Sequence, residues 1–150
     1  MISMMKGLTP IVKKVAQLMS GIICIYGIYI VVHGHLTPGG AFAGGIILAG
    51  AFILLILAFG SEVIKLRKEE TGSSISESLS VLATLILAAL GLLIGSKVFF
   101  NNYMPKGEVG ELVSAGAVPV YNILIGIEVA AAIITIFLAL IIFKEEEEER

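Results

Sequence analysis

His33–Gly45, with the sequence HGHLTPGGAFAGG, is the segment that decides how this chain is organised. It holds both histidines, one of the four prolines and five of the 17 glycines of the chain. The runs on either side are apolar and long enough to cross a bilayer. Thr37 followed by Pro38 is typical of a helix N-cap with proline at the first helical position. The segment therefore predicts a connection at a membrane surface that leads into a helix start with uncovered backbone N–H groups.

The composition predicts an integral membrane protein. Hydrophobic residues make up 57% of the chain, charged residues 15%, and the mean hydropathy is +1.01. A net charge of -2 without a basic cluster argues against nucleic acid as a partner. The single cysteine, Cys24, leaves no disulfide and no cysteine-rich metal or cofactor site within one chain. All 12 acidic residues are glutamates, a bias typical of thermophilic proteins, so we expect a hyperthermophilic source.

Four apolar windows of about 20 residues predict an all-α membrane protein with four transmembrane helices in a single domain, residues 1–150. The expected helices cover residues 10–33, 38–60, 74–100 and 120–143, and an acidic tail follows over 144–150. Ser74–Glu77, with the sequence SISE, has the pattern of a capping box and predicts the start of the third helix. The final glutamate run is most simply a solvated tail.

The basic residues indicate which ends of the helices face the cytoplasm. With a cytoplasmic N-terminus, eight of the 10 lysines and arginines fall on the cytoplasmic side, and only Lys97 and Lys106 fall on the other. Positive residues concentrate in the cytoplasmic loops of membrane proteins. Both termini are therefore predicted to be cytoplasmic, and the segment that begins at His33 is predicted to face outside.

Small residues recur at helical spacing along the expected helices. In lipid, close packing through such faces drives helix association. We therefore expect this chain to belong to a larger assembly, although a self-contained four-helix bundle would use some of the same faces. The faces are Ala41, Gly45 and Ala49 on the second helix, Ser80, Thr84, Ala88, Gly91 and Gly95 on the third, and Glu128, Ala131, Ala132, Thr135 and Ala139 on the fourth.

Two charged residues lie inside the expected membrane spans. Glu128 lies about six residues, roughly 9 Å, from the outer start of the fourth helix. Such a charge is costly in lipid and usually serves ion movement, so Glu128 is either a carboxylate that binds H⁺ or Na⁺ or a neutral or paired packing residue. Lys97 lies near the outer end of the third helix, where snorkelling to the interface explains it and pairing with Glu128 is the alternative.

His33 and His35 are the remaining candidates for an ion path. Histidine exchanges protons near neutral pH, so either residue can pass protons; the alternative is a hydrogen bond to the neighbouring backbone. Two histidines without further ligands do not make a zinc site. The chain has no nucleophile elbow, Walker loop, HExxH or dinucleotide-binding motif, so we expect no enzyme activity in the chain by itself.

Gly34–Gly45 resembles the signature of the MnhB/MrpB family, a small membrane subunit of multisubunit Na⁺/H⁺ antiporters. The family pattern reads roughly Gly-His-x-x-Pro-Gly-Gly-Gly-Phe-x-Gly-Gly, and Ala41 departs from it where the family has a third glycine. The length, the four spans and the sequence Pro119–Asn122 before the last helix also fit. The residues that carry the signature are Gly34, His35, Pro38, Gly39, Gly40, Phe42, Gly44 and Gly45.

The resemblance implies a subunit without a cofactor that works among other membrane subunits, in a module that exchanges Na⁺ for H⁺ across a prokaryotic cell membrane. Homologous modules are built into membrane-bound hydrogenase and sulfur-reducing complexes of hyperthermophilic archaea, and the glutamate-rich composition is closer to that group. Two alternatives stay open. One is a stand-alone four-helix, proton-coupled exporter of small molecules, and the other is a structural spacer between ion-moving subunits.

Overall fold

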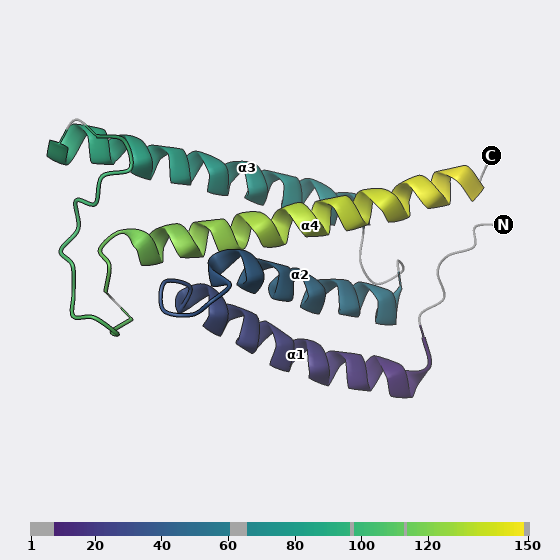
Figure 1. Cartoon of the computed structure of the whole chain (residues 1–150). Helices are drawn as coiled ribbons and strands as arrows, with labels where there is room; N and C mark the ends of the chain where they lie inside the picture. Colours follow the sequence, from purple (N-terminus) through teal and green to yellow (C-terminus); the bar gives the residue numbers. More distant parts are fainter. Residues whose placement is uncertain (1–7, 61–65, 97, 113, 149–150) are drawn as a thin grey trace.

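A computed structural model gives the structure of the chain and describes residues 8–60, 66–96, 98–112 and 114–148. Within these ranges the regular structure is helical, and each of the four long helices is long and apolar enough to cross a membrane. A π-helical turn, η1 (Leu92–Ser96), extends the third of them. The prediction of an all-α chain with four spans is confirmed. The long helices are α1 (Pro10–Val32), α2 (Gly40–Phe59), α3 (Leu66–Gly91) and α4 (Val118–Glu148), as Figure 1 shows.

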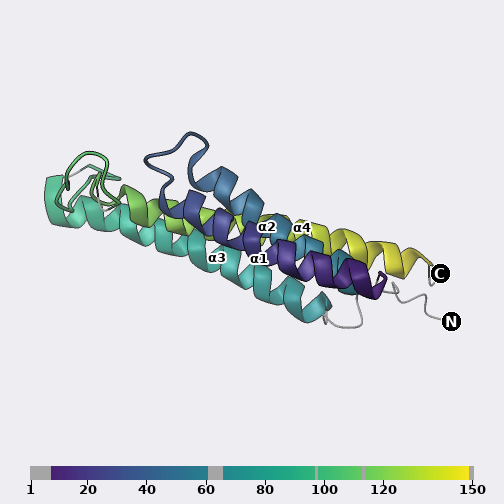
Figure 2. The same ribbon diagram turned by 90° about the horizontal axis from the view of Figure 1, so that it is seen from below.

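The four helices lie in the spatial order α1, α2, α4, α3, which is not their order in the sequence (Figure 1). α1 packs on α2, α2 on α4 and α4 on α3, whereas α1 touches α4 only slightly. In the described part of the chain, α3 makes no close backbone contact with α1 or α2. The helices share one long direction, as the view in Figure 2 also shows. The chain is therefore an open row of helices rather than a closed four-helix bundle.

Successive helices run in opposite directions. α1 begins and α4 ends at one end of the row, while the connections from α1 to α2 and from α3 to α4 lie at the other end (Figure 1). This arrangement agrees with four successive crossings of a membrane. That the end with the termini faces the cytoplasm stays a prediction.

The start of α2 differs from the sequence prediction. The hydroxyl of Thr37 donates a hydrogen bond back to the carbonyl oxygen of His33, at 3.1 Å, so it closes a turn and does not cap a helix. α2 begins at Gly40, and Gly39 precedes it with a φ of 97° that favours glycine. The prediction that Thr37 caps a helix starting at Pro38 was therefore wrong, because Thr37 belongs to the preceding turn.

α3 begins earlier and α4 ends later than the sequence predicted. α3 is already helical at Leu66, so the SISE sequence of Ser74–Glu77 lies inside a helix instead of starting one. Its α-helical part ends at Gly91, where an added Cβ would lie 2.9 Å from the backbone of Asn101. The chain folds back there, and the backbone N–H of Phe100 donates to the carbonyl of Ala88. α4 continues to Glu148, so the backbone of most of the expected acidic tail is helical.

Small residues form the contacts between helices. Gly44 of α2 lies against Val31 of α1, where an added Cβ would come within 2.6 Å of the valine side chain. Gly45 lies against α4, where an added Cβ would come within 2.7 Å of the carbonyl oxygen of Gly126. Ser80 and Ala88 of α3 are buried, as the predicted small face requires. Helix backbones approach closely through such residues, which is the usual packing in lipid.

Candidate functional site

The segment His33–Gly39 is held against both α2 and α4. An added Cβ at Gly34 would lie 2.9 Å from the backbone nitrogen of Ala41 and 3.0 Å from Nδ2 of Asn122, on the first turns of α4. The distance to the backbone nitrogen of Ala41 is too short for a side chain, so glycine is required where the loop, α2 and α4 converge. Close packing therefore explains Gly34, Gly44 and Gly45 of the signature, whereas Gly39 and Gly40 adopt a positive φ that favours glycine.

The two histidines have different surroundings. His33 Nδ1 donates to the carbonyl oxygen of Tyr29 at 2.9 Å, and its ring stacks on the Tyr29 ring with the centroids 4.1 Å apart. His35 Nε2 makes a long hydrogen bond of 3.4 Å to the carbonyl oxygen of Glu111, in the α3–α4 connection. Its other nitrogen, Nδ1, is buried and has no hydrogen-bond partner among the described residues. The local backbone contact therefore accounts for His33, whereas His35 joins the α1–α2 connection to the α3–α4 connection.

Asn102 organises the α3–α4 connection. Its side-chain oxygen accepts hydrogen bonds from the backbone N–H groups of Met104 at 3.2 Å and Ala117 at 3.1 Å, and its amide donates to Ala115 at 3.4 Å. Gly116 has a φ of 67°, and an added Cβ there would collide with the Asn102 side chain. These hydrogen bonds of Asn102 fix the backbone that leads into α4 and keep the connection folded over the end of the row.

A chain of hydroxyl groups fixes how α3 and α4 align. Ser73 donates to the carbonyl oxygen of Ala131 at 2.7 Å, and Thr135 donates to the Ser73 hydroxyl at 2.9 Å. Glu77 follows Ser73 by one helical turn, and Glu128 precedes Ala131 by nearly one turn. Because the two helices are antiparallel, both glutamates lie at about the same level, on the faces that α3 and α4 turn to each other.

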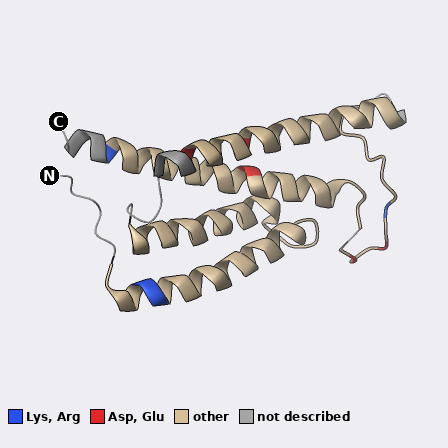
Figure 3. Cartoon of the chain, turned by 180° about the vertical axis from the view of Figure 1, so that it is seen from behind, with Lys and Arg blue, Asp and Glu red and all other residues tan. Residues whose placement is uncertain are grey.

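Glu128 lies in the apolar part of the span Val118–Lys144, whereas Glu77 lies in the polar first turns of the span Glu70–Ile94, just before its apolar part. Both are half-buried, and neither side chain has a hydrogen bond or ion pair with another described residue. Glu128 lies about 15 Å along α4, deeper than predicted, because the helix begins at Val118. Figure 3 shows how sparse charged residues are along the helices. An unpaired carboxylate at the depth of Glu128 requires a proton, a cation or a basic group that the described residues do not supply.

One predicted site residue, Lys97, is not described, and one carboxylate, Glu77, was not predicted. Lys97 lies outside the described residues, so its pairing with Glu128 stays a prediction. Glu77 was missed as a membrane carboxylate, because the SISE pattern assigned it to a helix start. The signal that would have found it is its spacing from Ser73 and Ser80 on one face of a helix that continues from Leu66.

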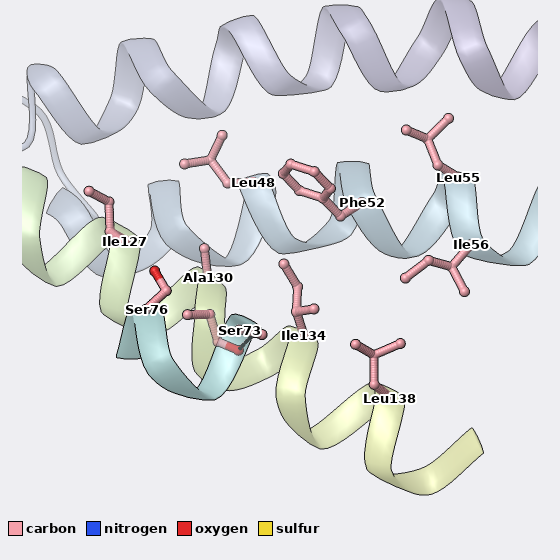
Figure 4. A pocket seen from close by; sticks show the side chains of 11 residues that line it. Leu48, Phe52, Leu55, Ile56, Ser73, Ser76, Ile127, Ala130, Ile134 and Leu138 are labelled. Carbon is pink, nitrogen blue, oxygen red and sulfur yellow. Dashed lines mark hydrogen bonds between the residues drawn. The ribbon is translucent and has the colours of Figure 1, made fainter. Parts of the chain in front are cut away.

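A groove of about 560 Å³ lies between α2 and α3 with α4 as its floor (Figure 4). Its lining is apolar apart from the hydroxyls of Ser73 and Ser76, and it holds no ionisable side chain. Among the described residues, no three His, Cys, Asp or Glu side chains cluster as metal ligands would. The groove can receive an apolar chain but lacks the groups that an ion path needs.

Comparison with known proteins decides the family. Residues 11–135 match the profile of a family described as a domain related to the MnhB subunit of Na⁺/H⁺ antiporter. The chain belongs to the MnhB family. The resemblance seen in the signature is thereby confirmed over most of the chain, and this MnhB-family chain is a multi-pass protein of the cell membrane.

Individual proteins are similar in sequence to this MnhB-family chain over most of its length. It is 38% identical over 132 residues to an uncharacterised protein of Methanocaldococcus jannaschii, covering 85% of this chain and 50% of that one. It is 29% identical over 138 residues to the putative antiporter subunit mnhB2 of Staphylococcus aureus strain Newman, covering 91% and 96%. The chain thus spans half the length of the Methanocaldococcus relative.

A solved structure shares the fold. A chain in the structure of the membrane-bound sulfane sulfur reductase, an archaeal respiratory membrane complex, matches with a TM-score of 0.71 at 30% identity. The match covers 90% of this chain and 59% of that chain. A chain with a similar fold therefore exists in a solved membrane complex, as part of a longer polypeptide.

Proposed function

We propose that this MnhB-family chain is a non-enzymatic subunit of a multisubunit Na⁺/H⁺ antiporter module, within a membrane-bound respiratory complex of the hydrogenase or sulfur-reducing type. In this role it helps form the path of Na⁺ or H⁺ together with neighbouring membrane subunits. The family match supports the module, and the archaeal respiratory complex that contains a similar chain supports the setting.

The open row of helices supports a place among other subunits. Only 17% to 33% of the residues in the most apolar window of each helix are buried within the chain. α1 and α3 do not close the row into a bundle, so the helices expose apolar faces along their length. Lipid covers part of this surface, and other membrane helices that pack against small residues are suited to the rest.

The observation that carries an ion-path role is the placement of Glu77 and Glu128. Two half-buried carboxylates at one level of two packed helices, without a basic partner among the described residues, attract a proton or a cation. A purely structural α3–α4 contact has no need of either carboxylate, since small residues and the Ser73 hydroxyl already join these helices.

The experiment is Na⁺-driven proton exchange in inverted membrane vesicles that contain the assembled complex. Glu128→Gln keeps the size of the side chain and removes its charge, and we expect exchange to fall about tenfold or more, equivalent to about 1.4 kcal/mol. Glu108→Gln, in the exposed α3–α4 connection, is the matched control and leaves exchange unchanged. Exchange that is equal in the two variants, at equal amounts of complex, removes the carboxylate from the ion path.

The competing functions give different results in the same preparation. A structural spacer predicts unchanged exchange for Glu128→Gln but loss of assembly when Gly45 is enlarged. A stand-alone exporter predicts a homodimer in mild detergent that binds lipophilic cations, with no other membrane subunits co-purified. The proposed subunit co-purifies with several membrane proteins.

A further inference from the structure

The buried side of His35 lacks a hydrogen-bond partner that its chemistry requires. The carbonyl oxygen of Glu111 can only accept, so the bond from His35 Nε2 places the ring proton on that nitrogen. In the neutral ring, Nδ1 then carries the lone pair and is an acceptor. This acceptor is buried, with no donor among the described residues.

A donor without a partner lies against Gly34, the residue before His35. Nδ2 of Asn122 is also buried without a hydrogen-bond partner, and it lies 3.0 Å from the position of a Cβ at Gly34, the residue before His35. Buried polar groups in native proteins almost always have a partner, either protein or ordered water. One unsatisfied acceptor and one unsatisfied donor at the same junction are therefore complementary.

The third buried atom without a hydrogen-bond partner, the hydroxyl oxygen of Tyr121, has different surroundings. The hydroxyl of Tyr121 is buried and unpartnered too, but the Tyr121 ring lies against Phe100, with centroids 5.4 Å apart. Tyr121 thus lies beside the α3–α4 connection, while its neighbour Asn122 lies beside the signature loop. This difference provides a control at the adjacent position.

We propose that Asn122 is the positioning residue of His35. Its side-chain amide donates to His35 Nδ1, directly or through one water molecule, and so fixes the ring between α4 and the Glu111 carbonyl. The imidazole then presents a defined lone pair on its buried side, where it can take up a proton. The positioning of a proton carrier rests on the proposed function, whereas the hydrogen bond itself does not.

The first test is structural and uses the wild-type complex. A cryo-electron microscopy map that resolves ordered water should show Asn122 Nδ2 within about 2.7–3.2 Å of His35 Nδ1, or both atoms at that distance from one water. The two arrangements separate the direct from the water-mediated bond. A map in which either atom is bonded to another group and neither arrangement is present overturns the proposal.

The second test is a double-mutant cycle of Na⁺/H⁺ exchange in vesicles with the assembled complex. Asn122→Leu should lower exchange about two- to tenfold, the range expected for one lost hydrogen bond. In a His35→Phe background, Asn122→Leu should have no further effect, because it acts through His35. Tyr121→Phe should leave exchange unchanged in both backgrounds.

The outcomes are distinguishable. Independent, multiplying effects of Asn122→Leu and His35→Phe overturn the positioning role, as does a Tyr121→Phe effect that also vanishes in the His35→Phe background. Wild-type exchange in His35→Phe removes His35 from the ion path, and the map then still decides whether the two side chains are bonded. If His35→Phe does not assemble, His35→Gln takes its place in the cycle.

Discussion

Gly45 is the residue at which α2 comes close to the backbone of α4, and replacing it with alanine tests whether small residues hold the row together. An added Cβ would lie 2.7 Å from the carbonyl oxygen of Gly126 and 2.8 Å from Cβ of Val129. Ordinary contact begins at 3.4 Å, so α2 and α4 must separate by about 0.7 Å. The carbonyl belongs to a helix backbone and cannot rotate away as a side chain can.

Overpacking of this kind costs about 1–3 kcal/mol. Gly50→Ala is the matched control, because it lies on the same helix and its added Cβ meets nothing within 4 Å. Both variants gain the same helix propensity, up to about 1 kcal/mol, so the difference between them isolates the α2–α4 contact. At about 2–4 °C per kcal/mol for a chain of this size, the Tm of Gly45→Ala should lie about 2–12 °C below that of Gly50→Ala.

The measurement is thermal unfolding of the two purified variants in the same mild detergent, followed by intrinsic tyrosine fluorescence or loss of solubility. Recovery of the assembled complex from membranes provides a second readout, in which Gly45→Ala should yield less complex. Equal Tm values and equal yields would refute the reasoning, since they would mean that α2 and α4 are not in close backbone contact.

Three further changes test the α3–α4 side of the molecule. Ser73→Ala removes the hydroxyl that joins the two helices and should lower the free energy of unfolding by about 0.5–1.5 kcal/mol. The control Ser78→Ala loses only a hydrogen bond within its own helix, so it should lower the Tm less in the same thermal unfolding experiment. Asn102→Ala removes three hydrogen bonds from the α3–α4 connection, so a protease added to the protein in mild detergent should cleave residues 98–112 faster than in the wild type. Unchanged cleavage would contradict the role of Asn102 in this connection. Glu77→Gln should reduce Na⁺/H⁺ exchange in vesicles, as expected for a carboxylate level with Glu128 of α4. Wild-type exchange would remove Glu77 from the ion path.

Most of the fold could be predicted from the sequence, because in lipid the number and approximate position of helices follow from apolar length. The ends of the helices were less predictable. The Thr37–Pro38 pair has the residues of a helix start, but its hydroxyl bonds back to His33. The SISE sequence has the residues of a capping box, yet it lies inside α3. Local capping patterns describe what a helix end needs, and they also occur where no helix ends.

The candidate site was only partly predictable for a related reason. Glu128 is recognisable in the sequence because it interrupts a long apolar run. Glu77 is not, since it follows a polar segment that also fits a loop and a helix start. The proximity of Asn122 to Gly34 depends on how the first turns of α4 meet the signature loop, and no local pattern contains that information.

The sequence by itself determined that this chain crosses a membrane four times and belongs with the MnhB-like subunits, because apolar length and the glycine signature are local properties of the chain. Only the tertiary structure decided that the helices lie in the order α1, α2, α4, α3, that α3 packs on α4 and not on the described residues of α1 or α2, and that Glu77 lies level with Glu128. The physical reason is that helix pairing in lipid depends on which small faces meet, and several helices of this chain carry faces that qualify.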